Sequence, residues 1–170
     1  MQTIIAVFIS LFCMTNSSLD FDQKRIPSTS NKCITQQEAE KILGQAAELE
    51  ESTTEQKKDN FRYKCTFKAT KNEPITDRAI RLNYMLEEYT NSDLAKATYT
   101  NIKKSNSRLS GLNTLDQIGD EAFCHSDGEN FYLLMTRKGS KIVRMKVNKF
   151  TREASPVVLQ NIVLEIMSSL

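Results

Sequence analysis

The chain has 170 residues, 26% of them charged and 39% hydrophobic, which suits one compact globular domain and excludes an intrinsically disordered protein. Its net charge of +2 is too small for a dedicated nucleic-acid binder. Tryptophan is absent and only five glycines are present, so no Gly-rich phosphate loop can be assembled. We therefore expect neither a nucleic acid nor a cofactor.

Residues 1–17 read MQTIIAVFISLFCMTNS, an apolar run followed by small polar residues. The run is too short to span a bilayer, which takes about 20 apolar residues. It fits a signal peptide that is cut after Ser17, although no Lys or Arg precedes the run. The alternative is a lipoprotein signal that ends before Cys13, the residue that would carry the lipid; the large Phe12 fits that cleavage site poorly. Both alternatives predict export to a bacterial periplasm, cell envelope or medium, with a membrane contact only through lipid on Cys13.

A single domain follows this export signal. Residues 18–32 are polar and show no periodicity, so we interpret them as a flexible tether. The domain itself covers residues 33–170. Its mixture of helical and strand patterns places it in the α+β class.

The domain is predicted to begin with a helix. Thr35 and Glu38 are spaced as a capping box, in which each side chain satisfies a free amide at a helix start. Apolar residues at helical spacing extend this helix to about Leu49, with Gly44 tolerated inside it. The polar residues 50–60 then predict a solvated loop.

Five segments have the alternation or the turn boundaries of strands. They are residues 61–69, 78–89, 119–126, 130–137 and 140–150.

Two more helices are predicted beside these strands. One covers residues 93–104, with Leu94, Thr98 and Ile102 facing inward, and is followed by an irregular loop. The last helix starts at Ser155 as cap, with Pro156 in its first turn.

Asp127-Gly128 is the strongest two-residue hairpin signal of the chain. Pairing outward from this turn sets Cys124 opposite Phe131 and Ala122 opposite Leu133. One face of the sheet then consists of apolar residues and forms the core: Ala122, Cys124, Phe131, Leu133, Met135, Val143, Met145 and Val147. The element order α-ββ-α-βββ-α predicts a five-stranded antiparallel sheet with helices packed on one face.

The chain resembles a family of secreted or lipid-anchored bacterial proteins of uncharacterised role. The motifs that carry the resemblance are CITQQEAEKILG, YKCTF and GDEAFCHSDGENFYLLMTRKG, and it covers about Lys32 to Leu170. It implies the sheet-and-helix fold that is also found in the PsbP protein of photosystem II, and a disulfide between Cys33 and Cys65. Such a bond would close a loop of about 32 residues and stabilise the domain by roughly 3–4 kcal/mol.

The adjacent Cys124 and His125 are the residues that most resemble a catalytic pair. In a strand, however, their side chains point to opposite faces, so they cannot form a nucleophile–base pair. Cys124 is expected in the core. His125 is expected on the outer face, where a single His makes no zinc site. Asp120 and Glu121 alternate in the same way and form no acid–base pair.

The outer face of the sheet is a better candidate for a binding surface. Alternation places basic residues there together with aromatic and aliphatic ones: Arg62, Lys64, Lys68, Arg81, Arg144 and Lys146 with Phe123, Tyr132, Leu134 and Met85. If the helices cover only the other face, this surface suits anionic or amphiphilic ligands and protein interfaces. The alternative is a solvated face whose long side chains shield a few apolar residues.

The sequence therefore predicts an exported, monomeric, non-catalytic module that binds an unknown protein or an anionic or amphiphilic ligand. The candidate binding residues are Arg62, Lys64, Arg81, Phe123, His125, Tyr132, Arg144 and Lys146. The alternative hypothesis is a small envelope enzyme, a hydrolase or a thiol-based enzyme, that uses His125, Cys124 or Asp120.

Overall fold

A computed structural model of the chain describes residues 33–170 except 73, 75, 150 and 152–153. The predicted signal peptide, Cys13 and the tether lie outside the described residues. The helices are α1 (Gln36–Leu43), α2 (Ser92–Asn106) and α3 (Pro156–Ser169); the strands are β1 (Ala47–Gln56), β2 (Asn60–Ala69), β3 (Arg81–Tyr89), β4 (Leu112–Leu115), β5 (Glu121–Ser126), β6 (Tyr132–Lys138) and β7 (Lys141–Val147). None of these helices combines the length and the apolar character that a membrane span requires.

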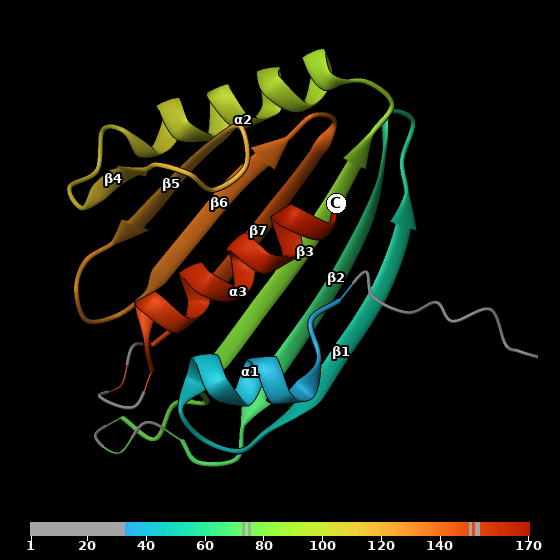
Figure 1. The fold of residues 1–170 in the computed structure, drawn as a ribbon. Helices are drawn as coiled ribbons and strands as arrows, with labels where there is room; N and C mark the ends of the chain where they lie inside the picture. The colour runs from blue at the N-terminus through green and yellow to red at the C-terminus, as the bar shows by residue number, and fades with distance from the viewer. Residues whose placement is uncertain (1–32, 73, 75, 150, 152–153) are drawn as a thin grey trace, which may run out of the picture.

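All the strands belong to one antiparallel, seven-stranded sheet in the order β1-β2-β3-β7-β6-β5-β4 (Figure 1). The fold is α+β, but the prediction of five strands is wrong. The two strands that the sequence analysis missed, β1 and β4, lie at the two edges of the sheet. Edge strands are exposed on one side, so they lack the alternating apolar pattern by which an inner strand is recognised.

The first helix ends earlier than predicted. Gly44 adopts a left-handed conformation with φ of 68° and caps α1, because glycine enters this region without steric cost. The chain then turns into β1, in which every residue after Ala47 is exposed. The acidic and threonine-rich sequence of β1 is typical of a loop. In the structure, the charges of β1 disfavour pairing of this open edge with other chains.

Helices cover both faces of the sheet, and the prediction that they share one face is wrong. α1 and α3 lie in front of the sheet in Figure 1 and pack on a core that includes Phe67 and Val143. α2 packs on strand residues that point the other way, among them Phe123 and Ile142.

The orientation of α2 also differs from the prediction. Ala95 and Tyr99 are its buried residues, whereas Leu94 is 36% exposed. The ring of Tyr99 packs edge-on against Phe123, with the ring centroids 5.7 Å apart. This aromatic pair buries more apolar area than Leu94 and Thr98 would, so it decides which side of the helix faces the sheet.

The hairpin between β5 and β6 has a longer turn than the predicted Asp127-Gly128 pair, because Ser126 is opposite Tyr132. The carboxylate Oδ1 of Asp127 accepts hydrogen bonds from the backbone N–H groups of Glu129, Asn130 and Phe131, at 3.1, 2.7 and 3.2 Å. These bonds stabilise a wider loop than the two-residue turn.

The longer turn shifts the register of β6 by three residues from the predicted pairing. Cys124 is therefore opposite Leu134, and not Phe131. Since a shift by an odd number of residues moves every side chain to the other face, Leu133 and Met135 lie on the α2 side. Tyr132 and Leu134 lie in the core under α1 and α3 instead.

Candidate functional site

Cys33 and Cys65 form a disulfide, with their Cα atoms 6.1 Å apart, which confirms the predicted pairing. The bond joins the residues before α1 to β2. The remaining described cysteine, Cys124, is a free thiol in the core and is 7% exposed.

The predicted binding residues do not form one surface. Phe123 and His125 lie on the predicted face but are buried under α2 and the loop after it. Tyr132 lies on the opposite face, where its hydroxyl accepts a hydrogen bond from Gln160 Nε2 of α3 at 2.8 Å. Burial raises the pKa of Tyr132 to about 12. The aromatic part of the predicted surface is therefore inside the molecule.

His125 holds the end of α2 against β5. Its Nδ1 lies 3.1 Å from Asn106 Oδ1, and its Nε2 lies 3.1 Å from the carbonyl oxygen of Ser110. The ring also packs edge-on against Phe131 at 5.0 Å between centroids. Both nitrogens face acceptor oxygens, and a neutral imidazole can donate to one of them; with 4% exposure, His125 is a packing residue of this structure.

Arg62 and Arg144 bind a buried carboxylate, Glu87, which is 1% exposed. Arg62 donates to Glu87 Oε1 from Nε at 3.1 Å and from Nη2 at 2.8 Å, and Arg144 donates to Oε2. Asn60 donates to the same Oε1 at 3.2 Å. Burial alone would raise the pKa of Glu87, but the charges and hydrogen bonds of Arg144 and Arg62 outweigh it and lower that pKa. We name these residues the Glu87 cluster.

Two more of the predicted cations are paired with acids of β1. Lys64 Nζ lies 2.8 Å from Glu51 Oε2, and Arg81 donates to Glu50 at 2.6 and 2.8 Å. The hydrogen bond from Arg81 lowers the pKa of Glu50. The sequence analysis missed these acids because it read β1 as a loop, so the predicted basic surface carries mixed charge.

What remains of the predicted surface is the part of the sheet face that α2 leaves uncovered. We name it the open sheet face; its residues are Lys64, Lys68, Arg81, Asn83, Met85, Phe131, Leu133, Arg144 and Lys146. The register makes these residues neighbours: Met85 lies between Lys64 and Arg144, and Lys146 lies between Asn83 and Leu133. Lys146 Nζ is 5.5 Å from the centroid of the Phe131 ring, within reach of a cation–π interaction.

The acidic residues of the GDEAF motif bind an arginine. Arg137 donates to Asp120 Oδ2 at 2.9 Å and to Glu121 Oε1 at 2.6 Å. Asp120 also accepts from the backbone N–H of Gly139 at 2.8 Å. Asp120 thus fastens the start of β5 to the turn between β6 and β7. It is not brought together with Cys124, which faces the other helices, or with His125 under α2.

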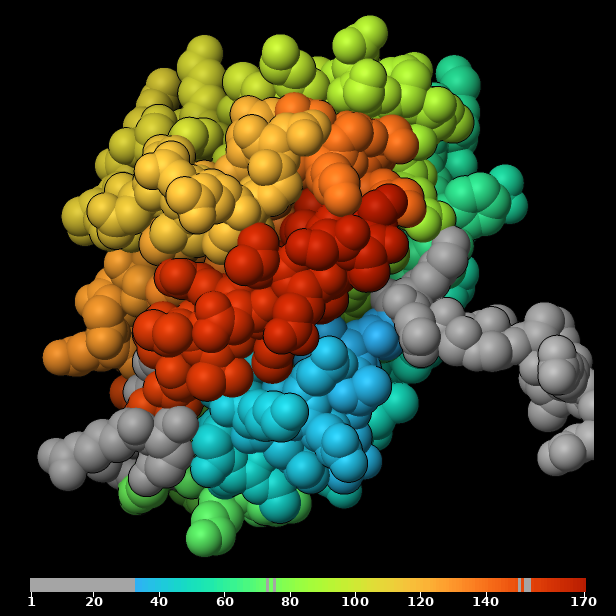
Figure 2. Space-filling view, in the orientation of Figure 1, coloured from blue at the N-terminus to red at the C-terminus, as the bar shows by residue number. Residues whose placement is uncertain are grey.

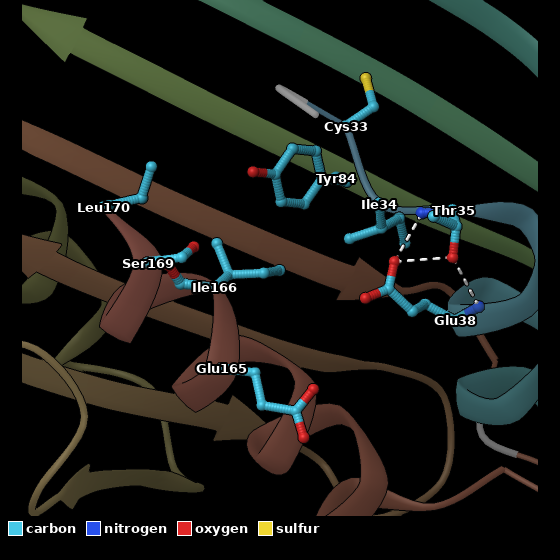
Figure 3. A pocket seen from close by; sticks show the side chains of 9 residues that line it. All are labelled: Cys33, Ile34, Thr35, Glu38, Tyr84, Glu165, Ile166, Ser169 and Leu170. Atoms are coloured by element: carbon cyan, nitrogen blue, oxygen red, sulfur yellow. Dashed lines mark hydrogen bonds between the residues drawn. The ribbon is translucent and has the colours of Figure 1, made fainter. Parts of the chain in front are cut away.

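A cavity of about 270 Å³ lies between the start of α1 and the end of α3, and its lining includes Tyr84, Glu38 and Glu165 (Figure 3). Figure 2 shows the end of α3, in dark red, and the start of α1, in blue, on the same side of the molecule. From the sequence, Glu38 was predicted only as part of a helix cap. No local signal brings Glu165 next to Glu38, because only the packing of α3 beside α1 does so.

No family model, curated protein or solved structure matches the chain. Among the residues that the structure describes, no three His, Cys, Asp or Glu side chains form a group that could hold a metal ion.

Proposed function

We propose that this protein is an exported, non-catalytic binding module that contacts a protein partner through the open sheet face. The observation that carries the proposal is that α2 covers only part of this face. Met85, Leu133 and Phe131 are left half-exposed among the lysines and arginines. Apolar side chains inside a polar, basic rim are typical of protein interfaces.

The shape of this surface favours a macromolecule over a small ligand. The open sheet face is built from neighbouring strands, and its residues line neither the cavity between α1 and α3 nor the hollows beside Gly119 and beside Tyr99. Small ligands need a concave site, whereas protein partners bind flat ones.

The charge of this surface favours a partner with acidic groups. Arg62, Lys64, Arg81 and Arg144 already have carboxylate partners. No ion pair is found for Lys68 or Lys146 within the described part of the chain, so these two ammonium groups are available to a partner.

The disulfide supports the export part of the proposal, because such bonds persist in oxidising compartments outside the cytosol. The apolar N-terminal sequence and the resemblance to secreted or lipid-anchored bacterial proteins support it as well. Mass spectrometry of the mature protein tests this part. A chain that starts at Ser18 or at a lipidated Cys13 is expected, and a chain that retains residues 1–12 in the cytosol would contradict it.

The test of the surface is photo-crosslinking in cells that naturally make the protein. A photoreactive residue in place of Asn83, at the centre of the open sheet face, is expected to capture a partner, while the same residue in place of Thr100 on α2 is not. The double variant Lys68→Glu/Lys146→Glu should abolish the adduct at position 83. The matched control Lys41→Glu/Lys96→Glu changes the net charge equally at exposed positions elsewhere and should retain it. Equal loss in both double variants would refute the proposed surface.

A further inference from the structure

The cavity between α1 and α3 lies across the sheet from the open sheet face. It is lined by Ile34, Ile166, Leu170 and the disulfide residue Cys33 on its apolar side. Glu38 and Glu165 contribute carboxylates, one from each helix (Figure 3). The floor is Tyr84 of β3, which is 2% exposed.

Both carboxylates retain free acceptor atoms. Glu38 uses Oε2 for the capping box, where it accepts from Thr35 N at 2.6 Å and from Thr35 Oγ1 at 2.8 Å. Its Oε1 makes no hydrogen bond within the described residues, and neither does the carboxylate of Glu165. Two negative charges at one small cavity repel anions and attract a cation.

The hydroxyl of Tyr84 is a second and independent sign of a ligand. It has no hydrogen-bond partner among the residues that the structure describes, although the side chain around it is almost fully buried. In Figure 3 the hydroxyl points toward Leu170, within the lining of the cavity. The hydroxyl oxygen itself keeps some accessible surface, so it opens into the cavity and can form a hydrogen bond with a ligand atom there.

The state of this phenol fits the same interpretation. Burial raises the pKa of Tyr84, and the negative charges of Glu38 and Glu88 raise it further. The phenol is therefore neutral at physiological pH, and its oxygen can accept a hydrogen bond from a cationic group or donate one to a polar group of the ligand. Lys141 is held by the backbone oxygen of Leu170 at 3.3 Å and by Glu88 at 3.9 Å, and among the described residues it forms no ion pair with either lining carboxylate.

We propose that this cavity binds a small organic cation that carries an ammonium group on an apolar body. The ammonium lies between Glu38 and Glu165, the apolar body lies against Ile34 and Ile166, and a polar atom of the ligand reaches the hydroxyl of Tyr84. This site is separate from the open sheet face and does not depend on the proposed partner.

The test uses three probes of nearly equal shape: 2-phenylethylammonium, 2-phenylethanol and 3-phenylpropionate. Titrations of the full domain are followed by NMR shifts of the backbone amides at the start of α1 and the end of α3. The ammonium probe is expected to bind at least about tenfold more tightly than the anion, because one hydrogen bond to a charged group contributes about 1.5–3 kcal/mol and 1.4 kcal/mol is tenfold.

The decisive variant is Glu38→Gln/Glu165→Gln, since Gln at position 38 keeps the capping box and removes only the charge. It should abolish the preference for the ammonium probe. The control Glu48→Gln/Glu129→Gln removes two exposed charges outside the cavity and should retain the preference. Equal binding of all three probes to the wild type, or shifts confined to other parts of the domain, would overturn the proposal.

Tyr84→Phe provides a second readout. It should weaken binding of tyramine, the 4-hydroxy derivative of the ammonium probe, by about 2- to 10-fold, the value of one ordinary hydrogen bond, without lowering the melting temperature; binding of 2-phenylethylammonium, which has no second polar atom, should not change. A clear fall in melting temperature would show that the hydroxyl has a protein partner and is not available to a ligand. Lys68→Glu/Lys146→Glu should leave binding of the ammonium probe unchanged. Failure of the proposed cation site can therefore be distinguished from failure of the proposed partner surface.

Discussion

The face of the sheet under α1 and α3 and the face under α2 are built from the same strands, yet they bury different side chains. The first face is covered by two helices and a disulfide, and its core is almost entirely apolar. The second face has one helix, which covers a small apolar cluster around Phe123 and Met135. At the margin of that cluster a carboxylate, Glu87, is buried between two arginines.

This difference shows how a sheet face is closed when helices are too few to cover it. Long cationic side chains extend over the strands, bury their aliphatic parts and keep their charged ends partly in water. A carboxylate beneath them must then be paired, because an unpaired buried charge is very costly. The two faces should therefore respond differently to mutation, to pH and to reductant.

The largest effect is expected from the Glu87 cluster. Glu87→Ala leaves Arg62 and Arg144 without their buried partner and should destabilise the domain by about 3–5 kcal/mol. The measurement is urea unfolding followed by circular dichroism. Glu55→Ala is the matched control. The Glu55 side chain is 52% exposed, and its carboxylate lies 3.7 Å from the Arg62 guanidinium. This substitution should therefore destabilise the domain by less than about 1 kcal/mol. Equal losses of stability in Glu87→Ala and Glu55→Ala would mean that the buried carboxylate contributes no more than the exposed one.

The same cluster predicts a pH dependence. The pKa of folded Glu87 is lowered, so its contribution is present above the ordinary Glu pKa of about 4.3 and is lost as pH falls through the folded value. Urea midpoints measured from pH 7 down to pH 3 should decrease more steeply for the wild type than for Glu87→Gln. Hydrogen bonds from Asn130 also lower the pKa of Asp127. Asp127 is present in both proteins, so it contributes equally to their two pH curves. Parallel curves would contradict the assignment.

On the other face the disulfide should matter most. Cys33→Ala/Cys65→Ala opens a loop with a sequence separation of 32 residues and should destabilise the domain by roughly 3–4 kcal/mol. Thermal melts with and without reductant measure this effect. Reductant should shift the wild type toward the double variant and leave the double variant unchanged.

A smaller effect is expected at His125 on the α2 face. His125→Ala removes the ring that packs on Phe131 and that donates to Asn106 Oδ1 or to the Ser110 carbonyl oxygen, so it should cost about 2 kcal/mol. Hydrogen exchange should increase at the end of α2 and in the loop that follows, and remain unchanged in α1 and α3. A loss of less than 0.5 kcal/mol, typical of an exposed position, would contradict the burial of this ring.

The smallest effect is expected at Cys124, on the α1 and α3 face. Cys124→Ala removes one sulfur atom from the core and should destabilise the domain by about 1 kcal/mol. The melts should respond to reductant as those of the wild type do. A variant that folds normally but loses partner capture would mean that this thiol has a role beyond packing.

Local signals in the sequence correctly predicted the parts of the fold that neighbouring residues determine. The capping box at Thr35, the cap at Ser155 and the alternation of β2 and β3 all form as expected, because a cap or an alternating strand is complete within a few residues. The pairing of Cys33 with Cys65 is also present, though it was implied by a resemblance and not by spacing.

Only the tertiary structure decided which residues share a surface. The edge strand β1 carries no apolar alternation, so its acids, which neutralise Lys64 and Arg81, became visible only when β1 paired with β2. The register of β6 depends on how Asp127 binds the backbone of its own loop, and it moved Tyr132 from the predicted surface into the core. In the same way, Glu38 and Glu165 meet at one cavity only because α1 and α3 pack side by side. Such contacts depend on residues far apart in the chain, and the short-range patterns of a single sequence do not encode them.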